Sequence, residues 1–131
     1  MLKNQKYSDA VFFSINGLAN EDKMTAKRYK SLCKRSGGIF RTVGLVQFVT
    51  FIEAKGKKEK HYAWLSEHLR TEMDKVGALK SKGTEDYLAN IRRLNLPEYM
   101  QASRNMLTLL QWHKRIGEIL IEGTADDTEG E

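Results

Sequence analysis

Apolar side chains recur at helical spacing along the first third of the chain. Residues 4–18 carry Tyr7, Val11, Ser14, Ile15 and Leu18 on one face, which predicts a first helix that ends near Asn16-Gly17. A second helix is expected from about Asp22, a candidate N-cap, to Arg35, with Tyr29, Leu32 and Cys33 facing the core. Ser36-Gly37-Gly38 is expected to break this helix.

The next segment, residues 39–54, is apolar on almost every side, so its periodicity alone allows a buried strand or a buried helix. Its sixteen residues exceed an ordinary strand, and the neighbouring segments are helical, so we predict a helix. Gly44 would lie inside that helix, where a close helix crossing would explain it.

The second half of the chain predicts three more helices. One spans residues 62–76 and stops at Gly77, and a short one begins with Thr84 as its N-cap. The last has Asn95 and Glu98 spaced as a capping box, Pro97 in its first turn, and a stop at Gly123 after about residue 122. The fold class is therefore all-α: a single-domain bundle of about six helices over residues 1–123, with a disordered acidic tail over residues 124–131.

Positive charge is concentrated in the first half of the chain. Residues 1–60 hold 13 basic and 5 acidic side chains, a net +8, whereas residues 61–131 hold 9 and 12, a net −3. The stretch from residue 23 to residue 52 has no acid and seven cations: Lys23, Lys27, Arg28, Lys30, Lys34, Arg35 and Arg41. Its four lysines are spaced i, i+4, i+7 and i+11, which predicts a cationic stripe roughly 16 Å long on one helix face.

The stripe suits either solvent or a polyanion, and a solvated basic face is the more common meaning of such a run. The seven cations are nevertheless our candidates for contacts to nucleic-acid phosphates. Weaker candidates on the later helices are Arg92, Arg93, Arg104 and Arg115. No RNP, KH or zinc-finger signature accompanies them, so we expect contacts to backbone phosphates with little reading of sequence.

Nothing in the sequence predicts an active site, a metal site or a cofactor. His61, His68 and His113 have neither a cysteine pair nor a His-Glu-x-x-His arrangement nearby and are expected to be solvated or at the edge of the core. Glu67 and Glu72 have basic neighbours and are expected to form surface pairs, and the single cysteine, Cys33, is expected in the core. With one cysteine, no intramolecular disulfide and no long apolar run, we expect a cytoplasmic protein. Because no active-site pattern is found, we expect that it is not an enzyme.

Three short elements, in order, resemble a known family. They are Arg28-Tyr29-Lys30-Ser31-Leu32 at the end of the basic helix, Ile39-Phe40-Arg41-Thr42-x-Gly44-Leu45 after the break, and Tyr99-Met100-x-Ala102-Ser103-Arg104 near the C-terminus. The chain resembles the small helical subunit of the type III-B CRISPR effector, the Cmr complex or RAMP module, over roughly residues 7–123.

The resemblance implies an all-α, non-catalytic subunit in prokaryotic antiviral defence. Proteins of this kind stack beside the backbone filament of the effector and help to line the channel for guide and target RNA, while the catalytic activities belong to other subunits. The implied partners are therefore the other Cmr subunits, sister copies of this chain, guide RNA and target RNA, with no membrane. The alternative is a structural adaptor whose basic face pairs with an acidic protein surface and does not touch RNA.

Overall fold

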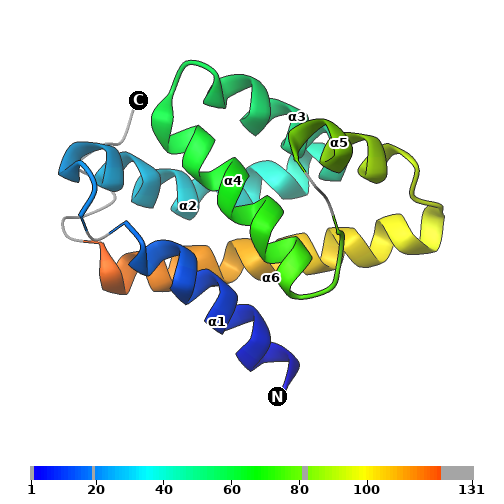
Figure 1. The fold of residues 1–131 in the computed structure, drawn as a ribbon, viewed down its shortest axis with the longest axis horizontal. Coiled ribbons are helices and arrows are strands. Elements are labelled where there is room, and N and C mark those ends of the chain that lie inside the picture. The colour runs from blue at the N-terminus through cyan, green and yellow to red at the C-terminus, as the bar shows by residue number, and fades with distance from the viewer. Residues whose placement is uncertain (1, 19, 81–82, 122–131) are drawn as a thin grey trace.

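The fold is built from helices alone in the residues that the computed structural model describes, which are 2–18, 20–80 and 83–121. The helices are α1 (Lys3–Asn16), α2 (Lys23–Val43), α3 (Leu45–Gly56), α4 (Lys60–Lys75), α5 (Thr84–Arg92) and α6 (Leu96–Leu120). The predicted all-α class is confirmed (Figure 1). Among the described residues, no helix is both long and apolar enough to cross a membrane.

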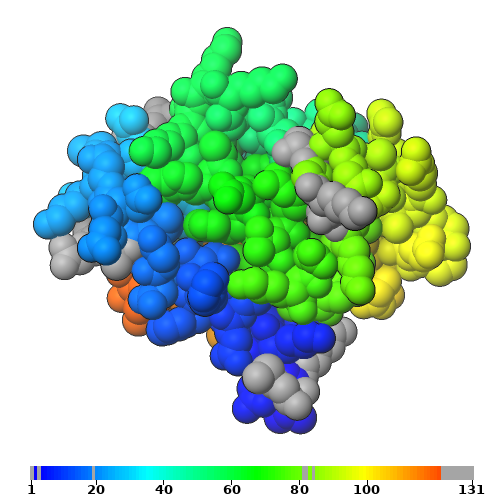
Figure 2. All heavy atoms as spheres, in the orientation of Figure 1, coloured from blue at the N-terminus to red at the C-terminus, as the bar shows by residue number. Residues whose placement is uncertain are grey.

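The longest helix, α6, runs across the whole molecule and carries α1 and α2 along its length (Figure 1). The directions of α2 and α6 are opposite, so the beginning of α2 lies near the end of α6. Helix α4 crosses in front of both and packs on α2 and α3. In the space-filling view from the same side, side chains of α4 fill the centre of this face (Figure 2). The core therefore lies between α4 and the α2–α6 pair.

The predicted break at Ser36-Gly37-Gly38 is wrong, because α2 continues through these residues to Val43. Two glycines inside a helix cost about 1 kcal/mol each relative to alanine. The buried face of α2 nevertheless continues past them: Tyr29, Ser36 and Phe40 are all buried at helical spacing. Burial of Phe40 against Phe48 on α3, with ring centroids 5.6 Å apart, outweighs the local preference.

The real boundary lies at Gly44, which was predicted inside a continuous helix over residues 39–54. Gly44 has φ of +84°, a left-handed conformation that side chains rarely adopt, and its N–H donates to the Phe40 carbonyl at 2.8 Å. Helix α3 starts at the next residue, Leu45. In its first turn the Val46 N–H donates to the Tyr99 hydroxyl at 3.2 Å. The apolar segment is thus shared between two helices.

The other helix ends follow the sequence more closely. Helices α1 and α4 lie where they were predicted, and the capping box at the start of α6 is confirmed by Glu98 N to Asn95 Oδ1 at 3.0 Å and Asn95 N to Glu98 Oε1 at 2.9 Å. The N-cap of α5 is Gly83, so the prediction of Thr84 at that position is wrong by one residue. The predicted stop at Gly123 and the predicted tail over residues 124–131 lie outside the described residues.

Candidate functional site

The cationic stripe of α2 is interrupted in the structure. Lys23 and Lys34 are exposed and Lys27 is half-buried, but Lys30 is only 7% exposed, and its Nζ donates to the Ile121 carbonyl at 3.1 Å. Ile121 is the C-cap residue of α6, and carbonyls at the end of a helix lack partners within their own helix. The prediction that Lys30 faces solvent is therefore wrong, since this lysine ties α2 to α6.

The three arginines of the stretch, Arg28, Arg35 and Arg41, are all exposed on α2. Arg35 folds back on its own helix, where its Nε donates to the Ser31 carbonyl at 3.3 Å. Arg41 belongs to the same continuous helix as Lys34 and lies two turns further on, so the two side chains share a face. The continuity of α2 thus fixes the relative placement of these two cations.

A basic groove lies between α2 and α6, with a volume of about 390 Å³. Lys34 and Arg41 line it from α2, and Lys114 and Arg115 line it from α6. One carboxylate, Glu118, also lines it, so the charged side chains of the groove sum to +3. The Arg115 guanidinium lies over the Trp112 ring, 5.6 Å from its centroid, which supports its position at the rim. We call these four cations and the space between them the basic groove.

The basic groove brings together residues that were predicted separately. Lys34, Arg41 and Arg115 were candidates in different parts of the sequence, whereas Lys114 was not singled out. The available signal was its position three residues after Gln111, on the edge of the α6 face that Gln111 and Arg115 share. Which α2 face would meet that edge depends on packing and cannot be found from spacing within α6.

The remaining candidates lie outside this groove. Arg92 is in the last turn of α5 and Arg93 is its C-cap, and both are exposed. Arg104 is exposed on α6 seven residues before Gln111, on the same helix face, and donates to the Gln101 side chain at 2.9 Å. Arg104 is thus aligned with the basic groove about 10 Å from Gln111 along the helix axis.

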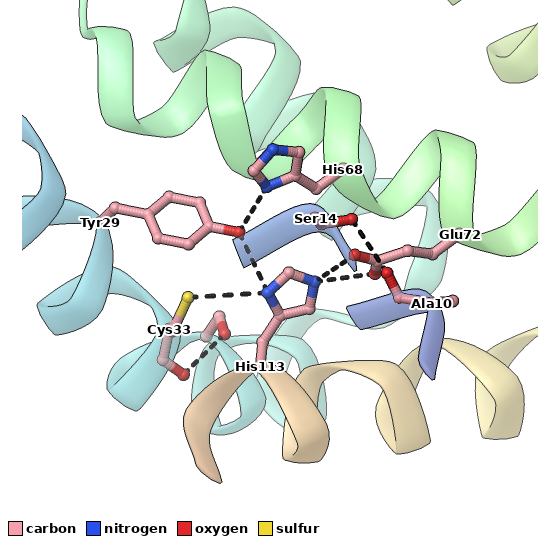
Figure 3. A network of polar contacts seen from close by, with 8 residues as sticks. Ala10, Ser14, Tyr29, Cys33, His68, Glu72 and His113 are labelled. Carbon is pink, nitrogen blue, oxygen red and sulfur yellow. Dashed lines mark hydrogen bonds and ion pairs between the residues drawn. The ribbon is translucent and has the colours of Figure 1, made fainter. Parts of the chain in front are cut away.

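A buried polar network lies beside the floor of the groove and ties three helices together (Figure 3). His113 on α6 places Nε2 at 2.7 and 2.8 Å from the two carboxylate oxygens of Glu72 on α4. Its Nδ1 lies 3.0 Å from the Tyr29 hydroxyl, which in turn lies 2.7 Å from His68 Nδ1. Cys33, which lines the groove, has its Sγ 3.9 Å from His113 Nδ1.

This network was missed by the sequence analysis. Glu72 and His113 are both 0% exposed, so the predictions of a surface pair for Glu72 and of a solvated or core-edge position for His113 are wrong. His61 is also buried, and Cys33 is buried as predicted. No short motif could reveal the pair, because its members lie 41 residues apart on different helices.

Burial and charge set the protonation of the network. Burial by itself would lower the pKa of His113, but the adjacent Glu72 carboxylate outweighs it and raises that pKa to about 10. Burial, with a smaller contribution from charged His113, lowers the pKa of His68 to about 3. His113 is therefore a cation that donates from both ring nitrogens, and neutral His68 accepts from the Tyr29 hydroxyl.

The chemistry of the network is structural. Glu72 and His113 are sealed from solvent and cannot reach a substrate, whereas they connect α4 to α6 and, through Tyr29, to α2. Within the described residues, no group of three or more His, Cys, Asp or Glu side chains is arranged to hold a metal ion. The basic groove, by contrast, is lined by exposed charged side chains that can meet a ligand.

Comparison with known proteins agrees with these features. The family model for CRISPR-associated protein (Cas_Cmr5) matches residues 3–120. The fold is similar to the crystal structure of a CRISPR-associated Cmr5 family protein from Thermus thermophilus, with a TM-score of 0.74, 20% identity, and coverage of 93% of this chain and 99% of that one. No curated protein matches the sequence at a significant level. The chain belongs to the Cmr5 family, the small subunit of the type III-B Cmr complex.

Proposed function

We propose that this chain is the non-catalytic small subunit of a cytoplasmic type III-B effector in antiviral defence, and that it holds guide or target RNA in the basic groove. In this proposal the subunit stacks beside the backbone filament together with sister copies and the other Cmr subunits. The observation that carries the RNA contact is the convergence of Lys34, Arg41, Lys114 and Arg115 on one groove. Family membership supports the assembly, and the groove geometry supports the ligand.

The composition of the groove favours phosphate over base recognition. Its polar side chains are mainly cations, which attract phosphodiesters from any sequence, and arginine can bind a phosphate through two parallel hydrogen bonds. No aromatic ring is among the described residues that line the groove, so it offers no platform on which bases could stack. The expected binding is therefore independent of RNA sequence and sensitive to salt.

The test compares two double charge reversals in the reconstituted effector complex. Lys114→Glu with Arg115→Glu changes the groove, whereas Arg92→Glu with Arg93→Glu makes the same change in net charge at the end of α5. With about four phosphates neutralised by a single strand, log K against log salt should slope near −3, and the groove variant should lose about half of that slope. Equal losses of this salt slope in the two variants would refute the groove as the RNA site.

The adaptor alternative uses a different part of α2. Lys23, Arg28 and Arg35 are exposed on α2 outside the groove, where an acidic partner subunit could cover them. Salt-sensitive association of partner subunits in RNA-free preparations, abolished by charge reversal at these three positions, would support that function. RNA affinity that falls only with the groove variant would favour the RNA proposal.

A further inference from the structure

The basic groove has a bare floor on its α2 side. Lys34, Gly37, Gly38 and Arg41 are spaced i, i+3, i+4 and i+7, so they share one face of α2, and all four line the groove. The two cations therefore flank two successive residues without side chains. Lys34 and Arg41 are roughly 10 Å apart along the helix axis, and between them this side of the groove is lined by the backbone of half-buried Gly37 and exposed Gly38.

The fold does not need glycine at either position. Among the described residues, a φ between +20° and +160° occurs only at Gly44 and Gly77, so Gly37 and Gly38 have backbone angles that any residue can adopt. A Cβ added to either one would meet no atom within 4 Å. Gly56 is different, because its Cβ would lie 3.0 Å from the Ala63 Cα, so close packing of α3 on α4 requires it. Packing and backbone geometry thus explain Gly56 but not the pair in α2.

The open space at these glycines is the groove itself. Side chains at positions 37 and 38 would project between the α2 cations and the α6 cations, because both positions line the groove. Without them, a bulky anion can approach the helix backbone closely while Lys34 and Arg41 reach it from the two ends and Lys114 and Arg115 from the opposite wall. Exposed Cα–H groups also make weak contacts with oxygen at such close approach.

We propose that Gly37 and Gly38 form a seat for the sugar–phosphate backbone of one RNA strand. This inference rests on the proposed function and specifies how the RNA lies: backbone against α2, with the bases directed away from the groove. Glu118 lies at the α6 wall and opposes the phosphate charge, so its removal should strengthen binding.

The test is a size series at one position, measured in the reconstituted complex with complementary target RNA. Gly38→Ala and Gly38→Leu give α2 similarly improved helix propensity, but the leucine fills far more of the groove. The seat predicts a graded loss of affinity, about threefold for alanine and more than tenfold for leucine, with subunit stoichiometry and helix content unchanged. Glu118→Gln should tighten binding by about two- to threefold.

Two results would overturn the seat. Unchanged affinity in both Gly38 variants would show that the floor is not used, even if Lys114→Glu with Arg115→Glu abolishes binding and so upholds the groove. Equal losses for alanine and leucine would show that the flexibility of α2, rather than the space above it, matters. If the charge reversals leave binding intact, the proposed function itself fails, and the outcomes are thus separable.

Discussion

The buried pair of Glu72 and His113 gives the sharpest test of the fold. The substitution Glu72→Gln keeps the size and one acceptor of the side chain but removes the charge that holds His113 protonated. Breaking a fully buried ion pair typically costs about 3–5 kcal/mol, and the retained neutral hydrogen bond returns about 1 kcal/mol. We therefore expect Glu72→Gln to lower the free energy of unfolding at pH 7 by about 2–4 kcal/mol.

The pH dependence of this loss is more specific than its size. Because the pKa of His113 is raised from 6.5 to about 10, its contribution to stability is complete below pH 6.5 and is lost as pH rises through 10. One proton corresponds to about 1.4 kcal/mol per pH unit, so the wild-type chain should lose about 3 kcal/mol between pH 7 and pH 9.5. Glu72→Gln should lose much less over this range, and the two stabilities should converge.

The assay is urea unfolding followed by circular dichroism at several pH values, with two-state behaviour checked by a second probe. Glu67→Gln is the matched control, since Glu67 lies on the same helix, α4, but is exposed. A wild-type stability that stays flat from pH 7 to pH 9.5 would refute the charged pair. So would a Glu72→Gln variant that unfolds like the Glu67→Gln control.

Four further substitutions test other parts of the structure by the same unfolding assay, and a fifth, Lys34→Met, is compared with one of them by RNA affinity. Because the pKa of His68 is lowered to about 3, its contribution is present above pH 6.5 and is lost as pH falls, so His68→Gln should flatten the decline of stability between pH 6.5 and pH 4. Gly44→Ala should destabilise the chain by more than about 1 kcal/mol, because alanine is strained at φ of +84°. Lys30→Met should cost about 1–2 kcal/mol through the lost bond to Ile121, but should leave RNA affinity unchanged, whereas Lys34→Met should lower the affinity. Tyr87→Phe should raise the free energy of unfolding by about 1 kcal/mol, because the Tyr87 hydroxyl is buried without a hydrogen-bond partner among the described residues, and an unchanged or lower value would contradict this.

Helix positions could be predicted where local chemistry and packing agree. Asn95, Pro97 and Glu98 specify the start of α6 within one turn of chain, and the structure has that capping box. At Gly37 and Gly38 local propensity disagrees with packing, because burial of Ser36 and Phe40 keeps α2 helical. Whether a helix continues through such glycines is decided by its contacts with other helices, which the residue spacing within one segment does not show.

The candidate site was likewise predictable only in part. The sequence identified Lys34, Arg41 and Arg115 as candidate cations, but their meeting in one groove depends on the antiparallel packing of α2 on α6. Lys30 and Lys34 both belong to the predicted lysine stripe, yet Lys30 is bonded to the Ile121 carbonyl, 91 residues away in the sequence. Helical spacing predicts which residues share a face, and tertiary contacts decide whether that face is covered.

The groups that join α2 to α6 are mostly different from those that line the groove. Lys30 bonds to Ile121 near one end of the pair, and Tyr29 contacts His113 in the core, whereas the four groove cations are exposed. Cys33 and Leu110 are exceptions: both line the groove and are buried in the core, and Cys33 contacts His113. Because the cations are not part of the core, their reversal should change RNA binding without moving the helices apart. A fall in RNA affinity in such variants, with the unfolding free energy unchanged, therefore measures the interface rather than the fold.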